Sequence, residues 1–260
     1  LKFSFIFSFE TLMTDKNQDL ENRIRDYWNR RAAAFGDLRE MELGSETAER
    51  WVKEFRAALP KRPLRILDIG TGPGFFAVLL TREGHTVTGI DLSPQMIEEA
   101  KAFAARHGAQ AQFFVMDAMK PAFAKESFDA IVTRNLTWTL PDVKAAYEAW
   151  TELLVPGGVL VNFDANYGPI SFTGLSHSLK KEGVSNAHSD IDDDDLIDCD
   201  QIKSELAVSK EARPAYDVGF LENLGYRVVA DEELTSRVYP EQDYASNPMT
   251  MFSIVATKKA

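Results

Sequence analysis

Short apolar runs alternate along this chain with longer segments in which an apolar residue returns at every third or fourth position. The runs predict buried β-strands, and the longer segments predict helices with one apolar face. The predicted strands are residues 65–69, 86–90, 111–115, 128–133 and 159–164. Because strands and helices alternate in short units, the pattern predicts an α/β fold with a doubly wound, mostly parallel sheet.

Helices and strands are also predicted on either side of this alternating segment. Residues 17–35 and 46–59 have helical spacing, and Ser45 is a good N-cap for the second of these helices. Beyond residue 213, a short helix precedes predicted strands at 226–229 and 251–257. These two strands would make the sheet seven-stranded, with an antiparallel strand at one edge.

The same pattern gives the predicted domain organisation. We expect a single domain at residues 17–260, in which residues 17–60 form an N-terminal helical lid. Residues 165–213 lack clear periodicity and predict an insertion after the fifth strand that caps the substrate. The acidic run within it, at 189–195, is interpreted as a solvated surface. A calcium loop is rejected there, because Asp195 and Gln201 stand where such a loop needs glycine and glutamate.

Residues 1–16 differ from the rest and are interpreted as a non-native or disordered extension. We therefore expect that removing residues 1–12 leaves ligand binding unchanged. The shift in melting temperature that a bound ligand causes would measure this. Loss of that shift in the truncated protein would contradict the interpretation.

A glycine-rich turn after the first predicted strand is the strongest candidate for a binding site. It has the spacing Gly70-x-Gly72-x-Gly74, and a helix is predicted to begin directly after it. Glycines allow a tight turn and a close approach of the backbone to a ligand, and a helix N-terminus offers free N–H groups. Phe75 stands where a dinucleotide fingerprint has its third glycine, and Asp68 precedes the turn. A carboxylate there suits a ligand with an ammonium group and would repel a pyrophosphate.

Polar residues end each of the predicted parallel strands. They are Asp68, Asp91, Asp117, Asn135 and Asp164. In doubly wound sheets, ligands bind beyond the carboxyl ends of the strands. Asp91 lies about twenty residues beyond the glycine turn, where such folds place a carboxylate on ribose hydroxyls.

Composition narrows the classes of partner. The formal net charge is −11, which argues against nucleic acid and anionic membrane surfaces as partners. No segment is apolar for long enough to span a bilayer. The single cysteine, Cys199, excludes an intrachain disulfide and a multi-cysteine zinc site, so we expect no metal and a cytoplasmic location.

Several motifs together resemble the class I S-adenosylmethionine-dependent methyltransferases, and among them the type-11 or ubiquinone-biosynthesis-like enzymes that act on small molecules. The motifs are residues 67–75 (LDIGTGPGF), 89–93 (GIDLS), 116–118 (MDA), 128–132 (FDAIV) and 154–158 (LVPGG). The resemblance implies a Rossmann-like methyltransferase fold with S-adenosylmethionine as cofactor and S-adenosylhomocysteine as product. It also implies a small-molecule acceptor and a monomer or homodimer.

The resemblance also implies roles for individual residues. Asp68 and the backbone of Gly70 and Gly72 would hold the methionine end of the cofactor, and Asp91 would bind the ribose hydroxyls. Leu92, Asp117 and Ala118 would contact the adenine. Further residues are assigned to the same site, namely Thr71, Gly74, Met96, Arg134, Asn135 and the lid residue Tyr27.

No catalytic base is assigned. Candidates are His177, His188, Tyr167 and Tyr239, all outside the motifs. Cys199 is interpreted as a poor nucleophile, because neighbouring acids would raise its thiol pKa. Two alternatives to a methyltransferase stay open: a member that binds the cofactor without catalysis, and a nicotinamide-dependent oxidoreductase.

Overall fold

All the predicted strands are present in the computed structural model, which describes residues 2–182, 191–241 and 249–259, and their side chains from residue 18 on. The strands form one seven-stranded sheet with the order β3-β2-β1-β4-β5-β7-β6. Their bounds are β1 Arg65–Ile69, β2 Thr86–Asp91, β3 Gln112–Val115, β4 Phe128–Arg134, β5 Leu154–Ala165, β6 Tyr226–Asp231 and β7 Met251–Lys258.

Strands β1 to β5 are parallel, and β7 is antiparallel to both of its neighbours, β5 and β6. The predicted antiparallel strand is therefore β7, which lies one position in from the edge that β6 forms. Since β1 lies between β2 and β4, the chain reverses its direction of winding at β1. This switch point is where open α/β sheets bind ligands.

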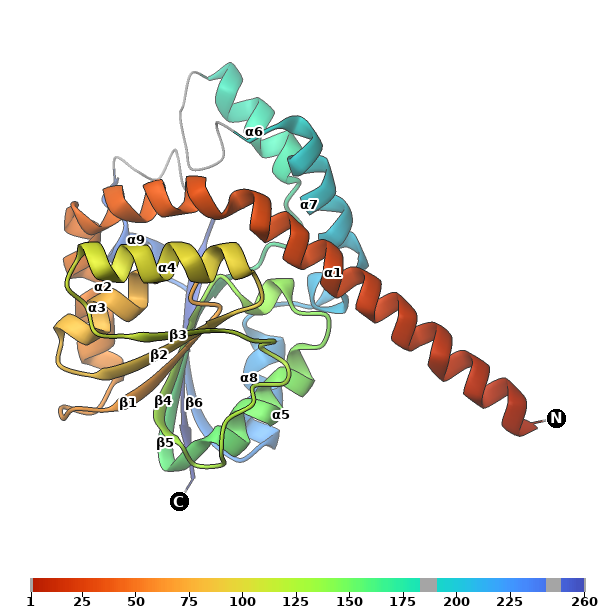
Figure 1. Ribbon diagram of the computed structural model, residues 1–260, viewed down its shortest axis with the longest axis horizontal. Helices are drawn as coiled ribbons and strands as arrows, with labels where there is room; N and C mark the ends of the chain where they lie inside the picture. Colours follow the sequence, from red (N-terminus) through yellow and green to blue (C-terminus); the bar gives the residue numbers. More distant parts are fainter. Residues whose placement is uncertain (1, 183–190, 242–248, 260) are drawn as a thin grey trace.

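Helices cover both faces of the sheet, and their bounds follow the predicted pattern closely between residues 46 and 153. They are α1 Lys2–Leu43, α2 Glu46–Ala58, α3 Phe75–Arg82, α4 Pro94–Arg106, α5 Val143–Leu153, α6 Phe172–Lys181, α7 Asp193–Glu205, α8 Ala215–Asn223 and α9 Leu234–Val238, with 3₁₀ turns η1 Thr137–Thr139 and η2 Ala207–Lys210. Helices α2, α3 and α4 lie on one face, and α5 and α8 lie on the other (Figure 1). Each face carries its own buried apolar cluster, so both sides of the sheet are packed.

Predicted N-caps begin several of these helices. Ser45, Ser93 and Asp142 each accept a hydrogen bond from a backbone N–H in the first turn of α2, α4 and α5 respectively. Pro94 follows Ser93 at the start of α4, where the missing N–H of proline costs nothing. The lengths of these helices were therefore set by local signals that the sequence shows.

Helix α1 is longer than the sequence pattern predicts. It is one helix from Lys2 to Leu43, it packs beside α4, and its N-terminal end extends away from the rest of the domain (Figure 1). No break in the helix marks the predicted domain boundary at residue 16. In the part of the chain with described side chains, no helix has the length and apolar composition needed to span a membrane.

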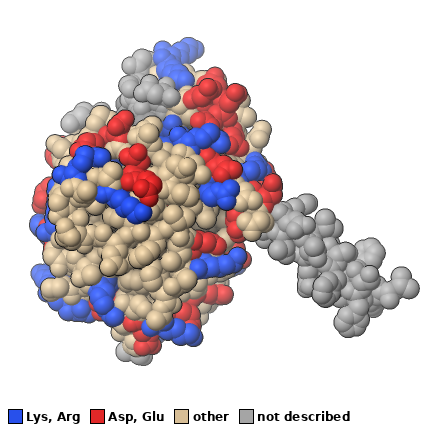
Figure 2. Space-filling model, viewed as in Figure 1, with Lys and Arg blue, Asp and Glu red and all other residues tan. Residues whose placement is uncertain are grey.

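The predicted insertion contains two helices, α6 and α7, and α7 packs against α1. The acidic run enters α7: Asp192 caps the helix, and Asp195 and Asp198 both bind Arg30 of α1 at 2.7 Å. Acidic and basic side chains lie together where α1 and α7 meet (Figure 2). The interpretation of the run as a solvated surface is therefore wrong for Asp195, which holds the insertion against the lid.

Candidate active site

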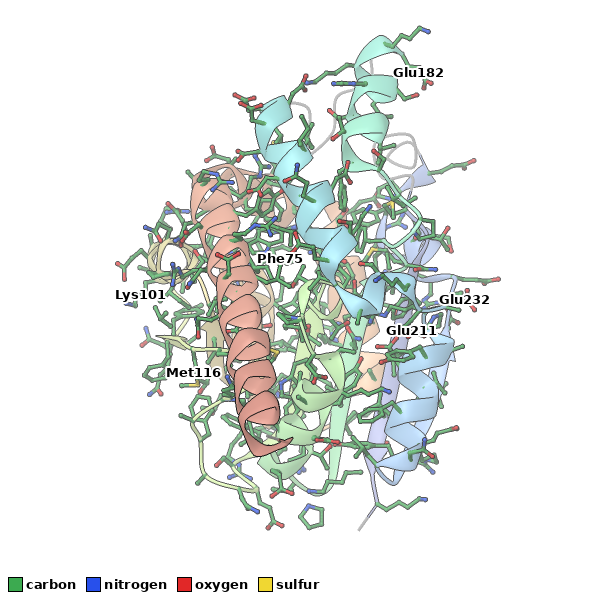
Figure 3. The ribbon with its side chains drawn as sticks, turned by 90° about the vertical axis from the view of Figure 1, so that its right-hand side faces the viewer. Phe75, Lys101, Met116, Glu182, Glu211 and Glu232 are labelled. Atoms are coloured by element: carbon green, nitrogen blue, oxygen red, sulfur yellow. The ribbon has the colours of Figure 1, made fainter. Side chains whose placement is uncertain are left out.

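A cavity of about 610 Å³ lies at the carboxyl ends of β1 to β4, beneath α1 and α6. Most of the site residues that the sequence predicted line it. They are Asp68, Gly70, Thr71, Gly72, Asp91, Leu92, Met96, Asp117, Ala118, Arg134 and Asn135. A view from the side places Phe75, which also lines the cavity, in the interior between α1 and α7 (Figure 3). Two predicted residues, Gly74 and Tyr27, do not line the cavity.

The glycine turn presents bare backbone to the cavity. Gly72 has φ +52°, and a Cβ placed there would meet no protein atom within 4 Å, so the space beside it is open. Gly74 has a different role, because a Cβ there would lie 3.1 Å from Ala100 of α4. We therefore correct the assignment of Gly74: it allows α3 and α4 to pack closely and does not face the ligand space.

Asp68 lies at the end of β1 beneath the turn. Its side chain is only 1% exposed, and the Thr71 hydroxyl donates to its Oδ2 at 2.6 Å. Burial disfavours the charged form and raises the pKa of Asp68 to about 7, although the hydrogen bond from Thr71 opposes the shift. A cation that entered the cavity would favour the ionised carboxylate.

Asp91 connects the end of β2 to the glycine turn. Its Oδ2 accepts the Gly72 N–H at 3.0 Å, and its Oδ1 accepts the Ser93 N–H at 2.9 Å. A carboxylate has about four lone-pair sites, so Asp91 keeps capacity to accept a hydroxyl proton from a ligand. Burial raises the pKa of Asp91 to about 6, and the backbone N–H groups of Ser93, Gly72 and Leu92 oppose that shift.

Residues after β3 and β4 complete this side of the cavity. Asp117 Oδ1 accepts the Met119 N–H at 2.8 Å, which fixes the turn after β3. Asn135 has φ +52°, and its backbone N–H donates to the Phe163 carbonyl at 2.8 Å. Its buried Oδ1 has no hydrogen-bond partner in the described part of the chain. A buried polar atom without a partner at a cavity wall is what a polar ligand would satisfy.

These observations agree with comparisons with known proteins. Residues 66–158 match a family described as a methyltransferase domain. The ubiquinone biosynthesis O-methyltransferase of Cereibacter sphaeroides (strain ATCC 17029) is 31% identical over 158 residues, which cover 58% of this chain and 64% of the relative. The trans-aconitate 2-methyltransferase of Streptomyces avermitilis is 35% identical over 133 residues, covering 50% of this chain and 48% of that protein. The chain thus spans less than two thirds of the length of either relative.

Solved structures share the fold. The YcgJ protein from Bacillus subtilis has a TM-score of 0.56 at 15% identity, covering 82% of this chain and 99% of that chain. An S-adenosylmethionine-dependent methyltransferase from Aquifex aeolicus has a TM-score of 0.51 at 18% identity, covering 81% and 88%. Residues 66–158 are thus similar to a methyltransferase domain, and the chain shares its fold with S-adenosylmethionine-dependent methyltransferases. The predicted Rossmann-like methyltransferase fold is confirmed.

The site also contains two charged residues of α1 that were not predicted, Arg39 and Glu42. The predicted site residue Arg134, at the end of β4, binds Glu42 at 2.9 Å and donates to the Tyr239 hydroxyl at 2.7 Å. Burial favours protonation of Glu42, but the charges of Arg134 and Arg39 outweigh it and lower the pKa of Glu42 to about 2. The first predicted helix ended near residue 35, so Arg39 and Glu42 lay within the predicted lid but in no predicted helix, and no face could be assigned to them.

Tyr27 is a second correction. It is 5% exposed and faces α7, where it packs beside Cys199, so it lies outside the cavity. Trp28, the next residue of α1, lines the cavity instead. Burial is the main cause that raises the pKa of Cys199 to about 12, with the acid Asp200 contributing less. The prediction of a poor nucleophile agrees in direction, but its physical cause is chiefly burial.

The candidate bases divide into two groups. Tyr167 and Tyr239 line the cavity. His177 lies at the surface of the protein, 3.2 Å from Asp193, and does not line the cavity. His188 falls outside the described residues. Burial raises the pKa of Tyr167, which keeps its hydroxyl protonated and makes it a hydrogen-bond donor.

The ionisation of Asp68 predicts how ligand affinity depends on pH. A ligand ammonium would bind the carboxylate, and below pH 7 binding must first remove its proton. We expect the affinity for S-adenosylhomocysteine to be constant above pH 7 and to fall up to about tenfold between pH 7 and pH 6. Titration calorimetry at several pH values would measure this. The Asp68→Asn variant should bind more weakly at pH 8 and show a shallower pH dependence, and equal slopes for both proteins would contradict the role of Asp68.

Proposed function

We propose that this protein transfers a methyl group from S-adenosylmethionine to a small-molecule acceptor by in-line displacement. The observation that carries the proposal is the contact between Asp91 and Gly72 at the cavity wall. This contact places a carboxylate that could bind ribose hydroxyls next to the backbone of a glycine, at the switch point of the sheet. The unpartnered Oδ1 of Asn135 adds an acceptor at the same wall.

The residues fit the cofactor group by group. Asp91 would accept both ribose hydroxyls, and Leu92 and Met96 would pack near the adenine. Asp117 would accept from the adenine amino group, and the Ala118 backbone would contact the ring. Asp68, Thr71 and the Gly70 to Gly72 backbone would hold the amino-acid end, next to Asn135 and Arg134. When bound, S-adenosylmethionine supplies a methyl group that is already activated by its sulfonium.

The contribution of the chain is alignment and exclusion of water. In-line displacement gains most from holding the reacting atoms in a productive geometry. Aromatic and aliphatic side chains from α1, η1 and α6 line the cavity, so the reacting groups would be shielded from solvent. No base is assigned, because the tyrosines at the cavity serve better as donors than as proton acceptors.

The acceptor is proposed to be a small molecule. The two curated relatives named above are called methyltransferases of ubiquinone biosynthesis and of trans-aconitate, which are small molecules. The net charge of −11 opposes binding to a nucleic acid backbone.

Two measurements test the proposal. Titration calorimetry should show binding of S-adenosylhomocysteine and none of NADH, and tight binding of NADH alone would favour the oxidoreductase alternative. Transfer of label from methyl-labelled S-adenosylmethionine should then occur to at least one member of a metabolite panel. Binding of the cofactor without transfer to any acceptor would favour a non-catalytic member.

Replacement of Asp91 provides a residue-level prediction. Asp91→Ala should weaken S-adenosylhomocysteine binding by about 1–3 kcal/mol, because two ligand hydroxyls and the Gly72 N–H lose their acceptor. Calorimetry would measure the loss. Asp129→Ala is a matched control, since that carboxylate also accepts a backbone N–H but lies at the opposite end of β4. Unchanged affinity in Asp91→Ala would remove this residue from the site.

A further inference from the structure

Helix α1, strand β4 and the segment after α9 bring four polar residues to one wall of the cavity. We call them the arginine cluster: Arg39, Glu42, Arg134 and Tyr239. Their side chains are largely buried; that of Arg39 is 12% exposed and that of Arg134 is 9% exposed. The cluster holds two cations and one carboxylate, so its formal charge is positive.

Glu42 cannot accept hydrogen bonds from further donors of the cluster, because both of its oxygens already have partners. Oε1 accepts from Trp51 Nε1 at 2.9 Å and forms an ion pair with Arg134 Nη2 at 2.9 Å. Oε2 accepts from Arg134 Nη1 at 3.1 Å and is also bonded to Arg39 Nη1. A carboxylate offers about four lone-pair sites, and these three donors together with the second Arg134 nitrogen already surround them. Any further donor of the cluster must find its acceptor outside it.

Hydrogen-bond donors that have no acceptor within the cluster remain on the side that faces the cavity. Arg39 bonds Glu42 through Nη1, and no other hydrogen bond of its guanidinium is made within the described part of the chain. The Tyr239 oxygen accepts from Arg134 at 2.7 Å, which leaves its own hydrogen available. Among the described residues, the charged side chains of the cluster therefore offer donors to the cavity and no carboxylate oxygen that is free to accept them. An oxyanion is the ligand group that satisfies this arrangement.

The position of the cluster indicates which ligand supplies the oxyanion. The nucleoside residues Asp91 and Asp117 follow β2 and β3 on one side of the switch point. Arg134 ends β4 on the other side, and Tyr239 precedes β7, which lies beyond β5. The space next to the cluster is thus the part of the cavity that the nucleoside would leave empty.

Aromatic side chains border the same space. The rings of Trp138, Tyr167 and Phe172 pack together, with centroids 4.7 Å apart for Trp138 and Tyr167 and 5.5 Å for Trp138 and Phe172. All three line the cavity, and Tyr167 lies within the electrostatic range of Arg134 and Arg39. The acceptor end therefore combines an apolar surface with a cationic, donor-rich wall.

We infer that the methyl acceptor carries a carboxylate that binds Arg39 and the Tyr239 hydroxyl, with the positive charge of Arg134 beside them, while its carbon skeleton packs on Trp138, Tyr167 and Phe172. This inference rests on the proposed function, since it assumes that the cofactor fills the opposite side of the cavity. It restricts the acceptor to apolar or aromatic carboxylic acids and excludes cationic amines.

Paired probes test the inference without knowledge of the acceptor. Protein saturated with S-adenosylhomocysteine is titrated with benzoate and cyclohexanecarboxylate, and with the neutral amides of both. We expect each carboxylate to bind about tenfold or more tightly than its amide, because hydrogen bonds to a charged group are the stronger ones. In Arg39→Gln, the ratio should fall to about one, while S-adenosylhomocysteine binds within about twofold of wild type.

Further variants keep the test decisive if Arg39→Gln folds poorly. Tyr239→Phe removes only the hydroxyl and should lower the carboxylate preference by about threefold or more. Arg39→Lys keeps the charge but loses the planar fork of donors, so it should retain only part of the preference. A melting curve of each variant separates loss of binding from loss of folding.

Three results have defined meanings. If wild-type protein does not bind S-adenosylhomocysteine, the proposed function fails. If it binds S-adenosylhomocysteine but prefers no carboxylate over its amide, only the present inference fails. If Arg39→Gln weakens S-adenosylhomocysteine about tenfold but leaves 5′-methylthioadenosine unchanged, the cluster binds the carboxylate of the cofactor, and the inference is overturned.

Discussion

The Gly72→Val variant is expected to lose S-adenosylhomocysteine binding by about a hundredfold or more, while the protein remains folded. A Cβ at Gly72 would meet no protein atom within 4 Å, so the added side chain would project into the space proposed for the ligand. A valine there also needs φ near +52°, which is unfavourable for a β-branched residue by roughly 1–3 kcal/mol. That strain is smaller than the stability of a typical domain, so binding should be lost before folding.

Gly108 provides the matched control. It has φ +65°, and a Cβ there would also meet nothing within 4 Å, but it follows α4 and does not line the cavity. Gly108→Val should therefore show a similar drop in melting temperature and unchanged affinity. Calorimetric titration and thermal melts of both variants would make the comparison. Binding by Gly72→Val within threefold of wild type would exclude the glycine turn as the cofactor cradle.

The sequence predicted the elements whose signals are local. Ser45, Ser93 and Asp142 cap helices because their side chains bond N–H groups only two or three residues away. Parallel pairing then brings strand ends to one edge of the sheet, which is why Asp68, Asp91 and Asp117 meet in one cavity. Neither step requires knowledge of distant contacts.

Residues whose role depends on tertiary contacts could not be predicted in the same way. Tyr27 and Trp28 are neighbours on α1 and differ by about 100° in direction, so either could have faced the cavity. The packing of α7 against α1 decides between them, because Cys199 and its helix cover Tyr27. Glu42 likewise gains its role from Arg134, which is 92 residues away in the chain.

The insertion shows the same limit on a larger scale. Its polar composition gives α7 little apolar periodicity, yet the helix buries Leu196, Cys199 and Ile202 in the same apolar cluster as the side chains of α1. Ion pairs at the surface add to this contact, including Arg23 with Glu205 at 2.7 Å. Asp164 is one of the polar residues at predicted strand ends, but it is fully buried and does not line the cavity. It binds Arg213, at the far end of the insertion, at 3.2 Å. Its position at a strand end therefore serves a structural contact.

The loss of this contact has the largest stability effect that we expect. Arg213 donates to Asp217 at 2.8 and 2.9 Å, to Asp164 at 3.2 Å and to the Thr137 hydroxyl at 2.6 Å, and its side chain is 2% exposed. Arg213→Met would leave two buried carboxylates without a cation. Removing one partner from a buried ionic network costs about 3–5 kcal/mol in free energy of unfolding. Because Thr137 begins η1, which lines the cavity, cofactor affinity should also fall.

Arg237 supplies the control, and pH supplies a second test. Arg237 also binds two carboxylates, those of Glu54 and Asp231, but its side chain is 34% exposed. Arg237→Met should therefore cost less than about 1 kcal/mol in urea unfolding.

Burial already raises the pKa of Asp164, and without Arg213 that pKa should rise further. A carboxyl whose pKa is raised in the folded state binds a proton more readily there than in the unfolded chain, so the folded variant gains relative stability as the pH falls. The loss in free energy of unfolding caused by Arg213→Met should therefore be smaller at pH 5 than at pH 8. Equal losses in the two variants, or a deficit that grows at low pH, would show that Asp164 and Asp217 do not depend on this cation.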